Sequence, residues 1–204
     1  MGRNALVFKG ILKYPNGMLE PRVLIVNNGS KEPADLLQAF PNAEVVAWSN
    51  LGSVELSNYN LVVLSGSSGF PVQGNETKLA KELELIRLSP VPVVGICYGF
   101  ELIVAAYGGT LKMLPDKENG IREVQIIDRD EVFEGVSALK VYEGHRWVAE
   151  SVSEPLMVLA RSEHGIEAVK HATRPIYGFQ FHPEKHLDET VGEQILSNIK
   201  TLFL

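Results

Sequence analysis

Short, uninterrupted runs of apolar residues alternate with amphipathic segments through the first half of the chain. The runs are rich in valine, isoleucine and leucine, which is typical of strands buried on both faces of a parallel sheet. The segments between them place apolar residues three or four positions apart, and this period predicts helices. The predicted strands are residues 22–26, 44–48, 61–64 and 91–96, and the predicted helices are residues 32–40, 76–88 and 100–107. This alternation predicts an α/β fold with a doubly wound, mainly parallel open sheet and helices on both faces.

The pattern changes after Gly109. Several strand-like segments follow in which apolar and polar residues alternate, and this favours antiparallel pairing with one face closer to solvent. They are residues 124–127, 139–142, 156–159, 166–169 and 176–180, and a closing helix is predicted over residues 189–203. We therefore expect one domain over residues 21–204 that carries an antiparallel β extension. Residues 1–20 stand apart as an N-terminal extension, for which an edge hairpin and a disordered arm both remain open.

Composition and charge argue against several classes of protein. The formal net charge is −6 and no basic stripe is present, which argues against nucleic-acid binding. No apolar run approaches the ~20 residues that span a bilayer, and the first ten residues lack the apolar stretch of a signal peptide. A single cysteine excludes an internal disulfide and is typical of a reducing compartment. The sequence therefore predicts a cytoplasmic protein.

The single cysteine, Cys97, lies where a buried strand passes directly into a helix. A strand, a sharp turn with a nucleophile at its apex and then a helix make up a nucleophile elbow. The turn lifts the sulfur above the sheet, and the helix N-terminus behind it favours thiolate over thiol. The local pattern is equally compatible with a small buried core residue, because free cysteine is among the most buried residue types.

A cysteine nucleophile needs a base, and the base needs a group that orients it. Of the five histidines, His182 has the most suitable surroundings, because it follows the strand-like residues 176–181 and precedes Pro183-Glu184. A carboxylate two residues away can hold one ring nitrogen and stabilise the imidazolium. His182 and His186 also have a spacing that can bind metal, but Pro183 disfavours a helix there and no zinc ligand set is complete. We expect no metal and no cofactor.

Together, Gly95-Ile96-Cys97-Tyr98-Gly99 and Gly178-Phe179-Gln180-Phe181-His182-Pro183-Glu184 resemble the motifs of the class I (triad) glutamine amidotransferases. The resemblance runs from about Arg22 to the C-terminus. Residues 167–178 are most similar to the glutaminase portion of GMP synthases, particularly their free-standing form. The resemblance implies a flavodoxin-like fold and a catalytic triad of Cys97, His182 and Glu184. It further implies hydrolysis of the glutamine side-chain amide through a γ-glutamyl thioester, with ammonia passed to a separate ATP-dependent synthetase subunit.

The resemblance also implies an oxyanion hole formed by two backbone N–H groups, those of Tyr98 and Ser67. The turn that carries Ser67 also contains Gly66, and the family usually has a second glycine where this chain has Ser67. A positive φ at that position would cost a non-glycine residue ~1 kcal/mol or more.

Two further departures from the family motifs fall where the substrate is expected. Glu101 stands in place of a glutamine that contacts the substrate, and Gly144 replaces the serine of a serine-histidine pair, while His145 remains. An acidic Glu101 would attract the ammonium group of glutamine, although it could equally serve only to complement the helix dipole.

Three functions remain open on the sequence. The first is the glutaminase of an amidotransferase, and the second is a γ-glutamyl hydrolase of the same fold that acts without a partner. The third is a non-catalytic regulatory subunit. The intact set of Cys97, His182 and Glu184 favours an enzyme.

Overall fold

In the computed structural model, which describes residues 20–30 and 33–204, one mixed sheet of 11 strands runs through the molecule. Its strands follow the order β2-β1-β3-β4-β11-β10-β9-β6-β7, with β8 paired to both β10 and β5 beside this path. Four neighbouring pairs, from β2 to β11, are parallel, and the remaining pairs are antiparallel. The predicted α/β fold with an antiparallel extension is confirmed.

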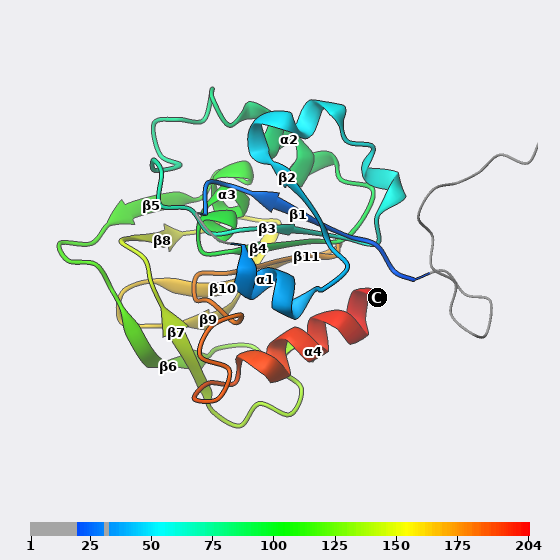
Figure 1. The fold of residues 1–204 in the computed structure, drawn as a ribbon. Coiled ribbons are helices and arrows are strands. Elements are labelled where there is room, and N and C mark those ends of the chain that lie inside the picture. Colours follow the sequence, from blue (N-terminus) through cyan, green and yellow to red (C-terminus); the bar gives the residue numbers. More distant parts are fainter. Residues whose placement is uncertain (1–19, 31–32) are drawn as a thin grey trace, which may run out of the picture.

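The parallel half of the sheet corresponds to the uninterrupted apolar runs. It consists of β2 (Glu44–Ala47), β1 (Val23–Asn27), β3 (Leu61–Leu64), β4 (Val93–Ile96) and β11 (Ile176–Phe179). Helices α2 (Ala80–Leu88) and α3 (Tyr98–Ala106) cover one face, and α1 (Ala34–Ala39) and α4 (Gly192–Phe203) cover the other (Figure 1). Short 3₁₀ helices in the described ranges complete this set: Trp48–Ser53, Leu56–Asn58 and Glu131–Phe133.

The core is divided into two apolar clusters by the sheet. In β1, Ile25 belongs to the cluster under α1 and α4, whereas Leu24 and Val26 belong to the cluster under α2 and α3. Alternate side chains of one strand therefore point into different clusters, and both sets are fully buried. This explains why the strand sequence is continuously apolar rather than alternating.

The antiparallel half contains two strands that the hydrophobic pattern did not predict. It consists of β10 (Ile166–His171), β9 (Leu156–Arg161), β6 (Gly120–Ile126), β7 (Leu139–Glu143), β5 (Thr110–Met113) and β8 (Trp147–Ser151). The unpredicted strands are β5 and β8. No side chain of β5 is fully buried, so its sequence lacks an apolar run. Strand β11 also differs from expectation, because it pairs parallel to β4 as well as antiparallel to β10.

The predicted helices lie where the structure has helices, but their starts differ: α3 begins two residues before its predicted start, whereas α2 and α4 begin three or four residues after theirs. Residues 76–79 form turns before α2, and residues 189–191 precede α4. The predicted N-terminal extension, residues 1–20, lies outside the described residues except for Glu20. Within the part of the chain that the structure describes, no helix combines the length and apolar character needed to cross a membrane.

Candidate active site

Three adjacent parallel strands end at one edge of the sheet and carry the predicted site residues there. Cys97 follows β4, Gly66 and Ser67 follow β3, and His182 follows β11. The order β3-β4-β11 makes these strand ends neighbours. Ligand sites in open α/β sheets lie at the carboxyl ends of strands, so the topology alone brings the three segments together.

Cys97 has a strained backbone between β4 and α3. Its φ of 52° and ψ of −102° place a non-glycine residue where L side chains are rarely found. The Cys97 N–H donates to the carbonyl of Phe179, at 2.7 Å, and the Cys97 carbonyl accepts from the N–H of Glu101, at 3.0 Å. These two bonds hold the strained turn between β11 and α3. Although Cys97 is 5% exposed, it lines a cavity and is not sealed in the core.

Glycines allow the helix to approach the sheet closely behind this turn. A Cβ on Gly99 would lie 2.3 Å from the carbonyl oxygen of Leu64, and one on Gly95 would lie 2.4 Å from the carbonyl oxygen of Gly99. Side-chain carbons do not come this close to backbone oxygens, so α3 can pack directly on β3 and β4 only because both positions are glycine.

Both the backbone and the side chain of His182 are held by neighbouring residues. The backbone N–H donates to the carbonyl of Tyr142 on β7, at 2.9 Å, and the ring nitrogen Nδ1 lies 2.7 Å from Oε1 of Glu184. Burial lowers the pKa of His182, but the carboxylate of Glu184 and the negative charge of Cys97 outweigh burial, and the pKa lies well above the ordinary 6.5. At neutral pH the ring is therefore an imidazolium that faces both acidic groups.

Gly66 lies beside both members of the predicted nucleophile–base pair. A Cβ on Gly66 would lie 3.1 Å from Cε1 of His182 and 3.8 Å from Cβ of Cys97. Among the described residues, Cys97 and His186 are the non-glycine residues with positive φ, so Ser67 adopts no positive φ. A side chain at position 66 would press on the imidazole of His182, and the backbone strain considered for serine at 67 does not arise.

The turn that carries Ser67 is fixed to the neighbouring strand end. The N–H of Asn28 donates to Oγ of Ser65, at 3.0 Å, and the Asn28 side chain donates to the Ser65 carbonyl, at 2.9 Å. The N–H of Gly69 donates to Oγ of Ser67, at 3.1 Å. This serine therefore uses its side chain to shape its own turn.

Two adjoining cavities, of about 450 and 560 Å³, meet above Cys97. His182, Glu184 and Gly66 line the first, and Tyr98, Glu101 and His145 line the second. Gly144 lines both, and a Cβ there would lie 3.4 Å from Cδ2 of His182. Lys117, from the loop between β5 and β6, lines both cavities. The sequence did not indicate this residue, because a single lysine in a loop belongs to no motif and no hydrophobic pattern.

The buried state of Glu101 changes the charge expected of it. Its side chain is 4% exposed, and burial raises its pKa to about 8, which the neighbouring Gln180 side chain offsets only in part. At neutral pH Glu101 is therefore protonated. In that form it resembles a glutamine in shape and can donate a hydrogen bond.

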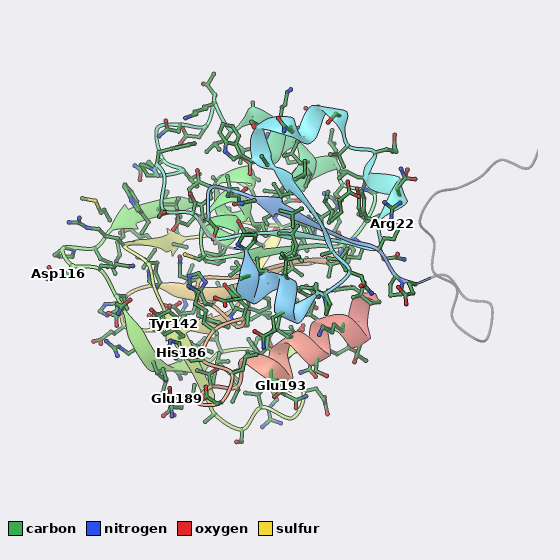
Figure 2. All side chains as sticks on the ribbon, viewed as in Figure 1. Arg22, Asp116, Tyr142, His186, Glu189 and Glu193 are labelled. Atoms are coloured by element: carbon green, nitrogen blue, oxygen red, sulfur yellow. The ribbon has the colours of Figure 1, made fainter. Side chains whose placement is uncertain are left out.

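His186, the other histidine of the His-x-x-x-His spacing, lines neither of these two cavities. Its ring stacks on Tyr142, with centroids 4.6 Å apart, and its Nδ1 lies 3.6 Å from Oε1 of Glu189. Figure 2 shows Tyr142 and His186 together beside β7, with Glu189 below them. His182 and His186 thus pair with different carboxylates.

Comparison with known proteins identifies the family. A family model described as glutamine amidotransferase class-I matches residues 19–200. The chain belongs to the class-I glutamine amidotransferases. It is 36% identical over 154 residues to a subunit of the glutamine-hydrolysing GMP synthase of Pyrococcus abyssi, covering 74% of this chain and 80% of that protein. The corresponding protein of Methanopyrus kandleri is 35% identical over 144 residues, which are 69% and 74% of the two chains.

A solved structure supports the same assignment. This amidotransferase superimposes on a candidate GMP synthase subunit from Thermoplasma acidophilum with a TM-score of 0.79 and 25% identity, over 89% of this chain and 93% of that one. The family predicted from the Cys97 and His182 motifs is confirmed, and so is the prediction of an enzyme.

Proposed function

We propose that this chain hydrolyses the side-chain amide of glutamine through a γ-glutamyl thioester on Cys97. One observation carries the proposal: Cys97, on a strained turn at the end of β4, shares a cavity with His182, whose ring is held by Glu184. A thiolate beside an imidazolium is the arrangement that cysteine-dependent acyl transfer requires.

The proposed reaction begins with attack of the Cys97 sulfur on the amide carbon. The His182 imidazolium gives its proton to the departing nitrogen, which leaves as ammonia, and a thioester remains. Neutral His182 then takes a proton from water as the water oxygen attacks the thioester. Glutamate leaves, and the thiolate and imidazolium are restored. The backbone N–H groups of Tyr98 and Ser67 would stabilise the tetrahedral oxyanion, each contributing about 3 kcal/mol.

The substrate would lie across both cavities, with its amide above Cys97. The backbone around Gly144 and His145 would contact the amino-acid end, and protonated Glu101 would act as a hydrogen-bond donor in the manner of an amide side chain. Gly66 would border the reacting amide, where a larger residue would meet the imidazole.

We further propose that the ammonia passes to a separate ATP-dependent synthetase subunit, and that the product of the pair is GMP. The relatives from Pyrococcus abyssi and Methanopyrus kandleri are named as subunits of glutamine-hydrolysing GMP synthases, and they match most of this chain. Glutamine hydrolysis by the isolated chain should therefore be slow and should increase when the synthetase subunit binds.

The alternative is a γ-glutamyl hydrolase that acts without a partner. The residues that favour it are Glu101 and Gly144, because both depart from the family motifs and both line the cavity. Rates measured on free glutamine and on γ-glutamyl-methylamide separate the two functions. The proposal expects glutamine to be preferred by roughly tenfold or more in kcat/KM, and equal rates on the two substrates would favour the hydrolase.

The role of Glu184 gives a pH prediction. In Glu184→Gln the pKa of His182 should fall, because the carboxylate that raises it is removed. His182 must be protonated to release ammonia, so the loss of activity at high pH should begin at a lower pH than in the wild type. We also expect kcat/KM to decrease by roughly 10²-fold or more, measured as glutamate release from about pH 6 to pH 10.

Glu189→Gln is the matched control, because it removes the carboxylate of the exposed His186–Glu189 pair. It should leave the pH profile unchanged. A Glu184→Gln variant with the wild-type profile would show that Glu184 does not set the protonation of His182.

A further inference from the structure

A second group of buried ionisable side chains lies behind the loop that lines the glutamine cavity. Glu143, at the end of β7, is 2% exposed, His145 is 3% exposed, and Glu167, on β10, is 1% exposed. Nε2 of His145 lies 2.8 Å from Oε2 of Glu143, and Oγ of Ser162 donates to Oε1 of Glu167 at 2.5 Å. One nitrogen or oxygen from each of the three ionisable residues falls within 4.8 Å of the others.

One oxygen of each carboxyl group has no hydrogen-bond partner among the described residues. These are Oε1 of Glu143 and Oε2 of Glu167. Two buried carboxylates this close together would repel each other strongly, and an unpaired buried charge is costly. A single proton between them removes the repulsion and gives both free oxygens a partner.

The cationic side chains that line the same cavity as the pair are engaged with another carboxylate. Arg122 of β6 and His164 of the β9–β10 turn both pair with Glu118, at 2.6 and 3.1 Å. The positive charges of His182 and Arg122 both favour ionised Glu143, and the negative charge of Glu118 opposes them.

The electrostatics also distinguish the two carboxyl groups. Burial, together with the nearby Glu143 carboxylate, raises the pKa of Glu167 to about 8, and burial raises the pKa of Glu143 to about 7 against the opposing charges of His182 and Arg122. Both pKa values are raised into the neutral range, so the pair keeps a proton near neutral pH, and the positive charge of His182 favours Glu143 as the ionised member.

We propose that Glu143 and Glu167 share one proton, and that this pair positions the loop that binds glutamine. The proposal rests on the proposed function. Gly144 and His145 follow Glu143 directly and line the cavity. The loop is also paired with the β5–β6 connection, because the N–H groups of Glu118 and His145 each donate to the other's carbonyl, at 2.8 and 3.1 Å.

Loss of the shared proton would act on substrate binding. Two ionised carboxyl groups would push Glu143 away from Glu167 and displace Gly144, whose Cβ position lies 3.4 Å from His182. Glu143 and Glu167 are thus positioning residues, since they act through the loop and touch no reacting atom. The expected result is a KM for glutamine that rises with pH, while kcat follows the titration of His182.

The test is Glu167→Gln, which supplies an N–H donor that cannot be lost. From about pH 7 to pH 9 the KM of the wild type should rise roughly tenfold, whereas that of E167Q should stay nearly constant. Glu163→Gln is the matched control, because the Glu163 side chain is 87% exposed, and it should retain the wild-type rise. Glu101→Gln is measured in parallel, because the pKa of Glu101 is also about 8.

A second measurement requires no enzyme activity. When folding raises the pKa of a carboxyl group, the folded protein becomes less stable as the pH rises from the unfolded pKa of that group, 4.5, through its folded pKa. The unfolding midpoint of E167Q should therefore fall less than that of the wild type between about pH 6 and pH 9, by roughly 3–5 °C. Glu143→Gln should show the same reduced fall, and E163Q should follow the wild type.

Parallel pH profiles of the unfolding midpoint for E167Q, E143Q and the wild type would overturn the proposal. So would a KM that stays constant in E101Q but rises in E167Q, or one equivalent of zinc or manganese recovered with the purified protein, because a metal would replace the proton. The wild type could instead lack glutaminase activity while the pH profile of its unfolding midpoint still differs from that of E167Q. That result would refute the proposed function and leave the shared proton standing.

Discussion

Replacing Cys97 with alanine is expected to reduce glutamine hydrolysis by roughly 10³-fold or more. The thiolate forms the bond to the substrate in the proposed reaction, and no other cysteine is present in the chain to replace it. Alanine has the same Cβ as cysteine, so it meets the same backbone restrictions at a φ of 52° and leaves the turn in place. The measurement is glutamate release at saturating glutamine.

Two controls accompany this variant. The unfolding midpoint of C97A should lie close to that of the wild type, because only one sulfur is removed from the cavity lining. Binding of glutamine, measured by calorimetry, should persist. Full hydrolysis by a folded C97A variant would refute covalent catalysis at this position.

The second large effect is expected at Gly99. In Gly99→Ala the new Cβ would lie 2.3 Å from the carbonyl oxygen of Leu64 and 2.7 Å from the Cβ of Leu64. The oxygen belongs to the backbone of β3 and cannot swing away, so α3 must move off the sheet. We expect a loss of about 3 kcal/mol in the free energy of unfolding. Activity should fall roughly 10²-fold, because α3 carries Tyr98 and begins directly after Cys97.

Gly52→Ala is the matched control for the added methyl group. Its Cβ would lie 2.9 Å from Nζ of Lys81, which is the free end of a flexible side chain. Its free energy of unfolding should remain within about 0.5 kcal/mol of the wild type. If urea unfolding gave G99A and G52A equal stability, the close packing of α3 on β3 would be incorrect.

The sequence predicted the parallel half of the fold because burial on both faces leaves a clear signal. Leu24 and Ile25 point to opposite faces and are both fully buried, so the apolar run has no gaps. Strand β5 left no such signal, since it is exposed or half-buried throughout and is held in the sheet by backbone pairing with β8. The starts of α2 and α4 were misplaced because the helical period extends into the preceding turns.

The motifs around Cys97 and His182 predicted where the candidate site lies, but several of its physical properties depend on tertiary contacts. Burial of the Glu101 side chain on α3 raises its pKa to about 8, and neither the position of this residue in the motif nor its type reveals that. Gly66 provides space beside His182, an effect that appears only when β3 and β11 are placed together. The Glu143–Glu167 pair joins β7 to β10, so no local pattern could have predicted it.

The most direct measurement of the central claim is the mass of the protein after rapid mixing with glutamine and acid quenching. A covalent intermediate predicts an added mass of one γ-glutamyl group, mapped to the peptide that contains Cys97 and absent from C97A. A glutamine-mimicking electrophile should label the same residue, and only that residue. Steady turnover of glutamine with no added mass on the protein, together with a Cys97 that the electrophile leaves unmodified, would contradict the account.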